Sequence, residues 1–218
     1  GTLNFAIAAE PPTYDCHASS TFAVIQRVAP HYSTVLKYEP HKYPAIVGDL
    51  ADSWTVSPDS LTYTIKLHPG VLFHDGTPLT SEDVKASYER IANPPQGINS
   101  ARRDSMIKLA SIETPDPLTV VFKLKEVDVA FLTNLASPWN CIFSAAKLKQ
   151  DPNFPARNVL GTGPFKFTAH VAGSYRTGER FDGYFRKGHP YLDGFRAITT
   201  SPSAMLNALA GRQVDAEF

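Results

Sequence analysis

The chain has 218 residues and equal numbers of acidic and basic side chains, 21 of each, so its formal net charge at pH 7 is zero. This balance gives no indication of electrostatic capture of nucleic acid or of an anionic membrane, and we expect no nucleic-acid partner. The length is sufficient to bury a core in one large domain or two small ones, and no apolar run approaches the length of a transmembrane helix.

The first elements are predicted to be a strand and a helix. Residues 1–8 have the pattern of a strand and lack the charged start and apolar core of a signal peptide, so we expect a processed or engineered start. After Pro11 and Pro12, a modest amphipathic pattern predicts a helix that Pro30 interrupts. Its apolar residues are Phe22, Val24, Ile25 and Val28.

Residues 48–90 predict a β-hairpin followed by a helix. Apolar residues on a period of two indicate two half-buried strands joined by a turn at 57–60. These residues are Trp54, Val56, Leu61, Tyr63, Ile65 and Leu67. Asp75 and Gly76 predict a tight turn, with Gly76 at positive φ. Thr80 and Asp83 have the spacing of a capping box and predict a helix that begins near Ser81.

The rest of the chain alternates short helices and strands between many of its 18 prolines. Helices are predicted over 99–109 and 129–135, strands over 118–124, 165–167 and 175–181, and a helix with a following strand over 204–215. The elements follow no strict βαβ order. This mixture favours an α/β lobe with an inserted α+β subdomain over a regular doubly wound sheet.

Motifs for catalysis, cofactors and metals are not recognisable. The chain contains no nucleophile elbow, zinc-binding helix or phosphate loop, and its seven histidines lack metal-ligand spacing. Pro164 removes an amide donor from the glycine pair at 161–163, which is therefore interpreted as a turn. We expect no catalytic residues, no cofactor and no metal site.

Two cysteines, Cys16 and Cys141, are too few for a disulfide scaffold and too far apart for a metal knuckle. In an oxidising compartment they could form one bridge between the N-terminal loop and the middle of the chain. Unpaired cysteines are also often buried, so two free thiols remain an equal alternative.

The order of these pieces closely resembles the family 5 extracellular solute-binding proteins, the peptide- and nickel-binding receptors of ATP-binding-cassette (ABC) importers. The segments that carry the resemblance are GDLADSW at 48–54, YTIKL at 63–67, FHDGTPLTSEDV at 73–84, GTGPF at 161–165, YFRKGHPYLD at 184–193 and AMLNALAGRQVD at 204–215. The resemblance spans the whole chain and corresponds to the N-terminal half of a family member.

The resemblance implies a lobe of the type II periplasmic-binding-protein kind. Residues 1–36 and 160–218 would form a discontinuous, incomplete main lobe, and 37–159 an inserted α+β subdomain. Family members are about twice as long, so we expect a truncated chain that lacks the second large lobe and by itself binds solute weakly or not at all. The expected function is capture of a solute without chemistry and its delivery to a membrane permease.

The expected solute is an oligopeptide or dipeptide, with an opine, a sugar or a nickel complex as alternatives. The resemblance further implies a monomer in the periplasm or outside the cell, with membrane association left open. Two alternative functions are a hydrolase lobe whose catalytic residues lie elsewhere and a pure interaction domain with a large exposed apolar patch.

Ligand contacts are expected from three segments. In the resembled family the loop after the first strand lies along the cleft, and its candidates here are His17, Ser19, Ser20, Thr21 and Phe22. Arg103 stands where some nickel-type relatives place an arginine that meets a carboxylate, with a solvated helix face as the alternative. Trp139 and Asn140 would supply an aromatic wall and an amide. Relatives that bind anionic chelates have an arginine near Asn140, and its absence here argues against a metal chelate.

Overall fold

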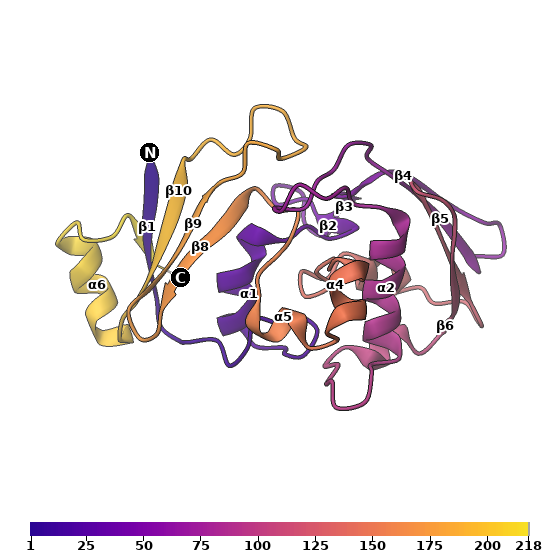
Figure 1. Cartoon of the computed structure of the whole chain (residues 1–218), viewed down its shortest axis with the longest axis horizontal. Helices are drawn as coiled ribbons and strands as arrows, with labels where there is room; N and C mark the ends of the chain where they lie inside the picture. Colours follow the sequence, from indigo (N-terminus) through magenta and orange to yellow (C-terminus); the bar gives the residue numbers. More distant parts are fainter. Residues whose placement is uncertain (218) are drawn as a thin grey trace.

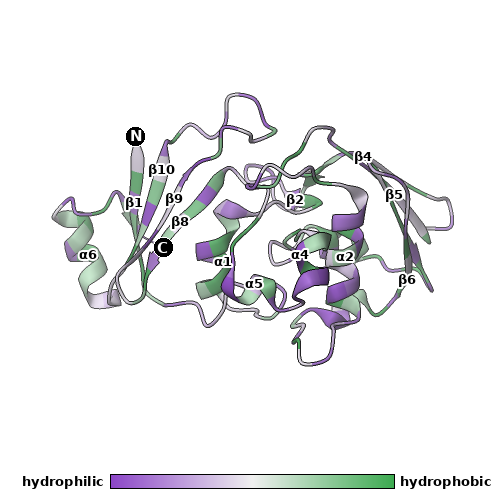
Figure 2. Ribbon diagram, viewed as in Figure 1, coloured by the Kyte–Doolittle hydropathy of each residue, from purple (hydrophilic) through white to green (hydrophobic). Residues whose placement is uncertain are grey.

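The computed structural model describes residues 1–217. Two separate sheets lie at opposite ends of an elongated molecule, and most of the helices lie between them (Figure 1). Figure 2 shows hydrophobic and hydrophilic residues mixed along these central helices, as expected for helices with one buried face. Among residues 1–217, no helix is both long and apolar enough to cross a membrane.

The first sheet joins the two ends of the described chain. Its order is β11 (Ala216–Glu217), β1 (Thr2–Ile7), β10 (Gly194–Thr199), β9 (Tyr175–Arg180) and β8 (Phe165–Val171). β1 runs parallel to both of its neighbours, whereas β8, β9 and β10 are antiparallel. Helix α6 (Pro202–Ala210) packs on this sheet through Met205, which meets Ala6 and Val214 in one apolar cluster.

The second sheet carries the largest apolar core. Its order is β4 (Ala51–Val56), β5 (Thr62–Leu67), β7 (Thr119–Leu124) and β6 (Leu109–Asp116), all antiparallel. Helix α2 (Ser81–Ala92) contributes Tyr88 to this core, where its ring meets Phe122 of β7. The Thr80 side chain and the Asp83 carboxylate form the predicted capping box at the start of α2.

Short elements connect the two sheets. They are α1 (Phe22–Val28), the 3₁₀ turn η1 (Ala29–His31), β2 (Leu36–Tyr38), β3 (Ile46–Gly48), the 3₁₀ turn η2 (Arg103–Met106), α3 (Phe131–Leu135), α4 (Ala145–Gln150) and α5 (Phe154–Arg157).

The predicted turn at Asp75 is confirmed, because its carboxylate accepts the Thr77 amide at 3.0 Å and Gly76 has φ of +85°. At the glycine pair, a Cβ on Gly163 would lie 2.5 Å from the His31 carbonyl carbon. This position therefore allows close backbone approach to η1.

The helix predicted over 99–109 is wrong. Only the turn η2 forms there, and Leu109 already pairs with Leu124 at the start of β6. The side chains of Asn99 and Ser100 donate instead to the carbonyls of Ala18 and Ile91. Asparagine and serine side chains can replace the backbone hydrogen bonds of a helix with bonds of their own. Here they bond to carbonyls outside the segment, so the helix does not form.

Candidate functional site

A disulfide joins two of the three predicted ligand segments. Cys16 lies in the loop after β1 and Cys141 follows α3, and their Cα atoms are 6.1 Å apart across the bridge. Both cysteines are buried in a cluster with residues of α1 and α4. Of the two alternatives left open by the sequence, the bridge is the one that the structure contains.

Three buried polar residues, Arg90, Asp15 and His17, form a hydrogen-bonded group next to this bridge. Arg90 of α2 forms a two-pronged ion pair with Asp15 and also donates to His17 Nδ1 at 3.1 Å. His17 Nε2 donates to the Cys141 carbonyl at 2.9 Å, which assigns the ring proton to Nε2. Burial lowers the pKa of His17 to about 4, so the ring is neutral at pH 7. Both ring nitrogens are occupied, so His17 holds the loop in place.

A cluster at the surface near the bridge is formed by Phe22, Trp139 and Arg102. Phe22 begins α1 with 70% of its surface exposed, and its ring centroid is 5.7 Å from that of Trp139 in an edge-on arrangement. The Arg102 guanidinium lies over the Trp139 ring, 4.4 Å from the ring centroid. This Phe22–Trp139–Arg102 cluster combines an aromatic surface with a planar cation stacked on it.

The segment that carries Arg102 is tied to the loop after β1 by hydrogen bonds. The Ala101 amide donates to the His17 carbonyl at 2.9 Å, and the Asn99 side chain donates to the Ala18 carbonyl at 3.0 Å. Partial burial lowers the pKa of Arg102, and its Nε donates to no residue that the structure describes. The three predicted segments therefore meet, and Arg102 brings a cation to their junction.

Arg103 and Asn140 lie outside this cluster. Arg103 is exposed and, with Asp104 and Lys125, lines a separate cavity of about 380 Å³. Asn140 is 1% exposed and donates to the Asn134 carbonyl at 2.7 Å, where it fastens the end of α3. The sequence analysis predicted Arg103, whereas in the structure its neighbour Arg102 is the arginine that lies over Trp139.

The remaining predicted residues shape the start of α1. Ser19 Oγ accepts the Thr21 amide at 3.2 Å and lies 3.1 Å from the Thr21 hydroxyl, so the two side chains stabilise the turn that leads to Phe22. Ser20 and Thr21 are exposed next to Phe22. Of the eight predicted residues, Phe22 and Trp139 are in direct contact at the surface.

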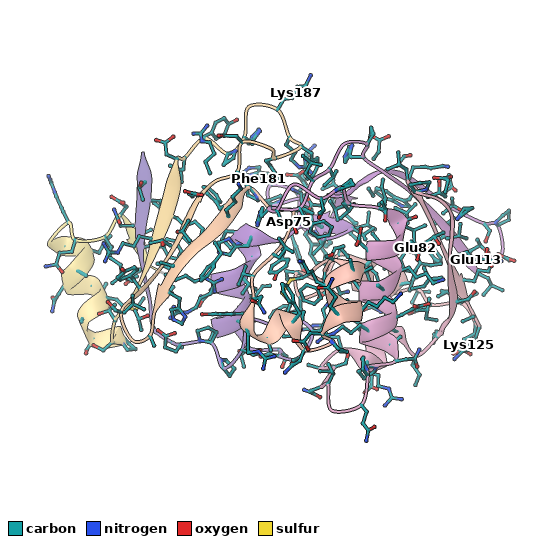
Figure 3. The ribbon with its side chains drawn as sticks, viewed as in Figure 1. Asp75, Glu82, Glu113, Lys125, Phe181 and Lys187 are labelled. Carbon is teal, nitrogen blue, oxygen red and sulfur yellow. A yellow bond between two sulfur atoms is a disulfide. The ribbon has the colours of Figure 1, made fainter. Side chains whose placement is uncertain are left out.

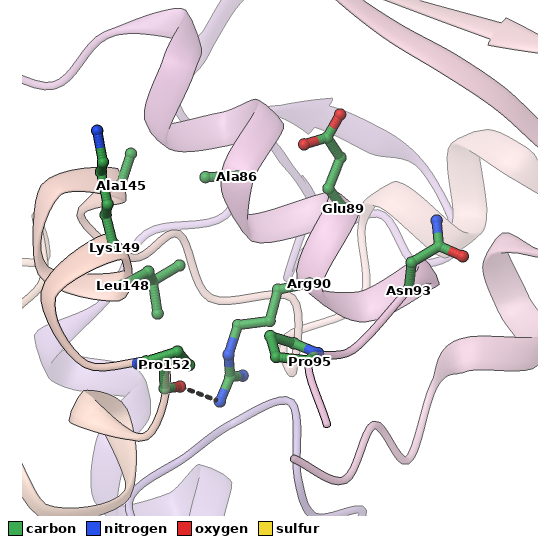
Figure 4. Close-up of a pocket in the computed structure, with 9 residues that line it drawn as sticks. All are labelled: Ala86, Glu89, Arg90, Asn93, Pro95, Ala145, Leu148, Lys149 and Pro152. Carbon is green, nitrogen blue, oxygen red and sulfur yellow. Dashed lines mark hydrogen bonds between the residues drawn. The ribbon is translucent and has the colours of Figure 1, made fainter. Parts of the chain in front are cut away.

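A further cavity of about 460 Å³ lies between α2 and α4 (Figure 4). It is lined by Ala86, Glu89, Arg90, Asn93, Pro95, Ala145, Leu148, Lys149 and Pro152. The Arg90 guanidinium reaches its wall but is already bonded to Asp15 and to the Pro152 carbonyl. None of the predicted ligand residues lines this cavity, and no group of histidine, cysteine or acidic side chains within residues 1–217 could hold a metal ion.

Comparison with known proteins identifies the relatives of this chain. Residues 45–218 match the family model described as "Bacterial extracellular solute-binding proteins, family 5 Middle". The glutathione-binding protein GsiB of Pectobacterium atrosepticum is 40% identical over 158 residues, which are 72% of this chain and 30% of GsiB. A putative ABC transporter peptide-binding protein of Brucella abortus is 37% identical over 180 residues, 79% of this chain and 33% of that protein.

Solved structures show the same fold. AgaA from A.tumefacien R10, in complex with agropinic acid, matches with a TM-score of 0.92 and 35% identity over 99% of this chain. The oligopeptide-binding protein AppA from Bacillus subtilis, in complex with a nonapeptide, matches with a TM-score of 0.88 and 28% identity over 98% of this chain. The chain covers 43% of each of these two structures. The predicted α/β fold of the periplasmic-binding-protein type is confirmed.

Proposed function

The chain belongs to family 5 of the bacterial extracellular solute-binding proteins, and from this membership we propose that the whole protein captures a small solute and delivers it to an ABC permease. Capture would proceed by closure of two lobes over the solute, without chemical change of the solute. The protein would act as a monomer in the periplasm or at the outer cell face.

The Phe22–Trp139–Arg102 cluster is the observation that carries this proposal. Exposing most of a phenylalanine ring to water is unfavourable by about 25 cal/mol per Å² of apolar area, and closure over a solute would remove that cost. Arg102 adds a planar cation whose geometry suits a carboxylate. The cluster would thus form one wall of the solute cleft and hold an organic body by its apolar surface and an acid group by its charge.

A peptide is the solute class that we favour. The relatives' names specify glutathione or peptides, and the matched structures hold agropinic acid and a nonapeptide. All of these compounds carry carboxylate groups, which could pair with the Arg102 cation. An opine or another small acid remains the alternative, whereas a nickel chelate is less favoured because the position of Asn140 offers no second cation.

We also propose a division of the chain into a main lobe of 1–36 and 160–218 and an inserted subdomain of 37–159. The two sheets support it, because β1 pairs with β10 and β11 whereas β4 to β7 pair only among themselves. The disulfide would then join the main lobe to the subdomain and fix the two sides of the solute wall relative to each other.

The test is calorimetric titration of the whole protein with glutathione and with short peptides. Replacing Arg102 by Met keeps the length and apolar surface of the side chain but removes the charge, and we expect affinity for a bound solute to fall about tenfold or more. Arg103→Met makes the same change one residue away, on an exposed side chain, and should leave affinity unchanged. The opposite ranking would assign the contact to Arg103 and reject the proposed wall.

A further inference from the structure

Another cavity, which we call the loop cavity, lies between the loop that joins β9 to β10 and the strands β2 and β8. Its volume is about 540 Å³, within the range of small-molecule sites. It is lined by Lys37, Pro164, Phe165, Tyr184, Arg186, Lys187, His189, Pro190, Tyr191 and Leu192. In Figure 1 this loop forms the upper edge of the molecule, whereas the loop after β1 runs along the lower edge. The loop cavity is thus separate from the proposed solute wall.

The lining of the loop cavity is cationic. Lys37, Arg186 and Lys187 contribute three positive charges, and none of the lining residues is acidic. Asp49 is the one carboxylate paired with them within residues 1–217, at 3.4 Å from Lys37 and 3.0 Å from Arg186. Three cations against one carboxylate leave an excess of two positive charges, on a chain whose formal net charge is zero. A concave surface of one charge sign concentrates counter-ions.

Arg186 is held in place by the protein. Its Nη2 donates to the Gly48 and Asp49 carbonyls and to the Asp49 carboxylate, at 3.0 to 3.3 Å. Lys187, in contrast, takes part in none of the ion pairs formed by the described residues. Figure 3 shows Lys187 extending from the crest of the loop. The rim therefore combines one fixed cation with one free cation.

Aromatic rings supply the apolar surface of the loop cavity. Phe165 and Tyr184 are partly buried in its wall, and Tyr191 is 80% exposed, with its ring centroid 4.6 Å from that of His189. His189 Nδ1 donates to the Lys187 carbonyl across 3.3 Å, so Nε2 of the neutral ring is an acceptor and the ring contributes apolar surface to the wall of the loop cavity. Rings beside donors of positive charge suit a ligand with an apolar body and an anionic head.

We propose that the loop cavity binds a phosphate group carried on an apolar or aromatic body. A phosphate monoester bears close to two negative charges at pH 7, which match the local excess, and its oxygens can accept from several donors at once. Lys37 and Lys187 would meet the phosphate, and Phe165, Tyr184 and Tyr191 would pack on the body. The source of the phosphate is either a soluble ester or a lipid headgroup. This site does not depend on the proposed solute function.

The soluble source is tested with phenyl phosphate, titrated into the whole protein by calorimetry, with phenol as the uncharged control. The Arg102→Met background excludes binding at the solute wall. We expect saturable binding of phenyl phosphate that weakens as KCl is raised and falls about tenfold in Lys187→Gln. Lys149→Gln is the matched control, because Lys149 is also exposed and lines the cavity between α2 and α4. It should bind phenyl phosphate as the parent protein does.

The lipid source is tested by co-sedimentation with vesicles that contain phosphatidic acid, whose headgroup is a phosphate monoester, and with vesicles of phosphatidylcholine alone. Binding to the anionic vesicles that Lys187→Gln abolishes and Lys149→Gln preserves would assign the site to a lipid headgroup, whereas phenyl phosphate binding without vesicle binding would assign it to a soluble ester. Either result supports the proposal. It is overturned if neither probe binds in a way that depends on Lys187, or if Lys149→Gln causes the same loss.

Discussion

Two buried arginines differ in the hydrogen-bond partners of their side-chain nitrogens. Arg90 is 4% exposed and shares two hydrogen bonds with the Asp15 carboxylate. Arg176 of β9 is 0% exposed, and its three side-chain nitrogens have no hydrogen-bond partner among the described residues. Its guanidinium lies instead over the rings of Tyr14 and Phe167, with 4.7 and 4.9 Å between its central carbon and the ring centroids. Desolvation lowers its pKa to about 10, so it still carries charge at pH 7.

This difference predicts opposite effects of the same substitution. Arg90→Met leaves a buried carboxylate without its partner and should lower the free energy of unfolding by about 3–5 kcal/mol. Arg176→Met removes an unpaired buried charge and keeps an apolar chain of similar length, so stability should be unchanged or rise by about 1–4 kcal/mol. Chemical denaturation at pH 7 measures both. A larger loss in Arg176→Met than in Arg90→Met would contradict this assignment.

His17 predicts how stability depends on pH. Burial, assisted by the Arg90 charge and opposed by Asp15, lowers the pKa of folded His17 from 6.5 to about 4. Between these values the unfolded chain binds a proton that the folded chain does not, so this contribution to stability is complete above pH 6.5 and is lost as the pH falls toward 4. The loss amounts to about 3 kcal/mol. Unfolding followed from pH 7 to pH 4 should therefore show a shallower decline in His17→Gln than in the parent protein.

Exposed His189 provides the control for this measurement. His189→Gln makes the same change at an exposed side chain, and a decline as shallow as that of His17→Gln would show that the effect is not specific to His17. If the free energy of unfolding declined equally with pH in His17→Gln and in the parent protein, His17 would take up a proton in the folded chain as readily as in the unfolded chain.

The sequence analysis selected Arg103, but Arg102 is the arginine that faces Trp139. The two are neighbours, and which of them faces Trp139 depends on the hydrogen bond from the Ala101 amide to the His17 carbonyl. That bond joins segments more than 80 residues apart along the chain. Phe22 and Trp139 were each predicted, but their contact depends on the Cys16–Cys141 bridge, which the sequence left as one of two alternatives.

At the scale of elements, the disulfide is the main connection between the two sides of the proposed solute wall. It closes a segment of 125 residues, and cross-links of long segments restrict the unfolded chain most. Replacing both cysteines by alanine should lower the free energy of unfolding by about 2–5 kcal/mol. Denaturation of the parent protein with and without a reductant measures the same quantity. If neither change alters stability, the bridge does not hold the folded chain together.

Elements with local signals were predicted well. The hairpin at β4 and β5 follows from alternating apolar residues and a polar turn, and α2 begins at Ser81 because its capping box is complete within four residues. The segment 99–109 failed for the opposite reason. Its outcome was decided by the pairing of Leu109 with Leu124 and by side-chain bonds to residues outside the segment, which a local pattern does not reveal.

At the scale of the whole molecule, a sheet built from both ends of the described chain lies at the opposite end of the molecule from a second sheet built from its middle. The sequence predicted the mixture of elements and its class, but the pairing of β1 with β10, nearly 200 residues apart, had no local signal. The resemblance to a family implied that the two ends of the chain share a lobe, but it did not give the pairing of strands within that lobe.

The central claim is that the whole protein holds a small solute unchanged, with Arg102 in contact with it. Native mass spectrometry of the gently purified whole protein, followed by denaturation and identification of any released compound, tests this most directly when wild type and Arg102→Met are compared. We expect one intact, carboxylate-bearing molecule per wild-type protein and a smaller bound fraction in Arg102→Met. A compound that wild type releases in chemically altered form, or that Arg102→Met retains equally, would contradict the claim.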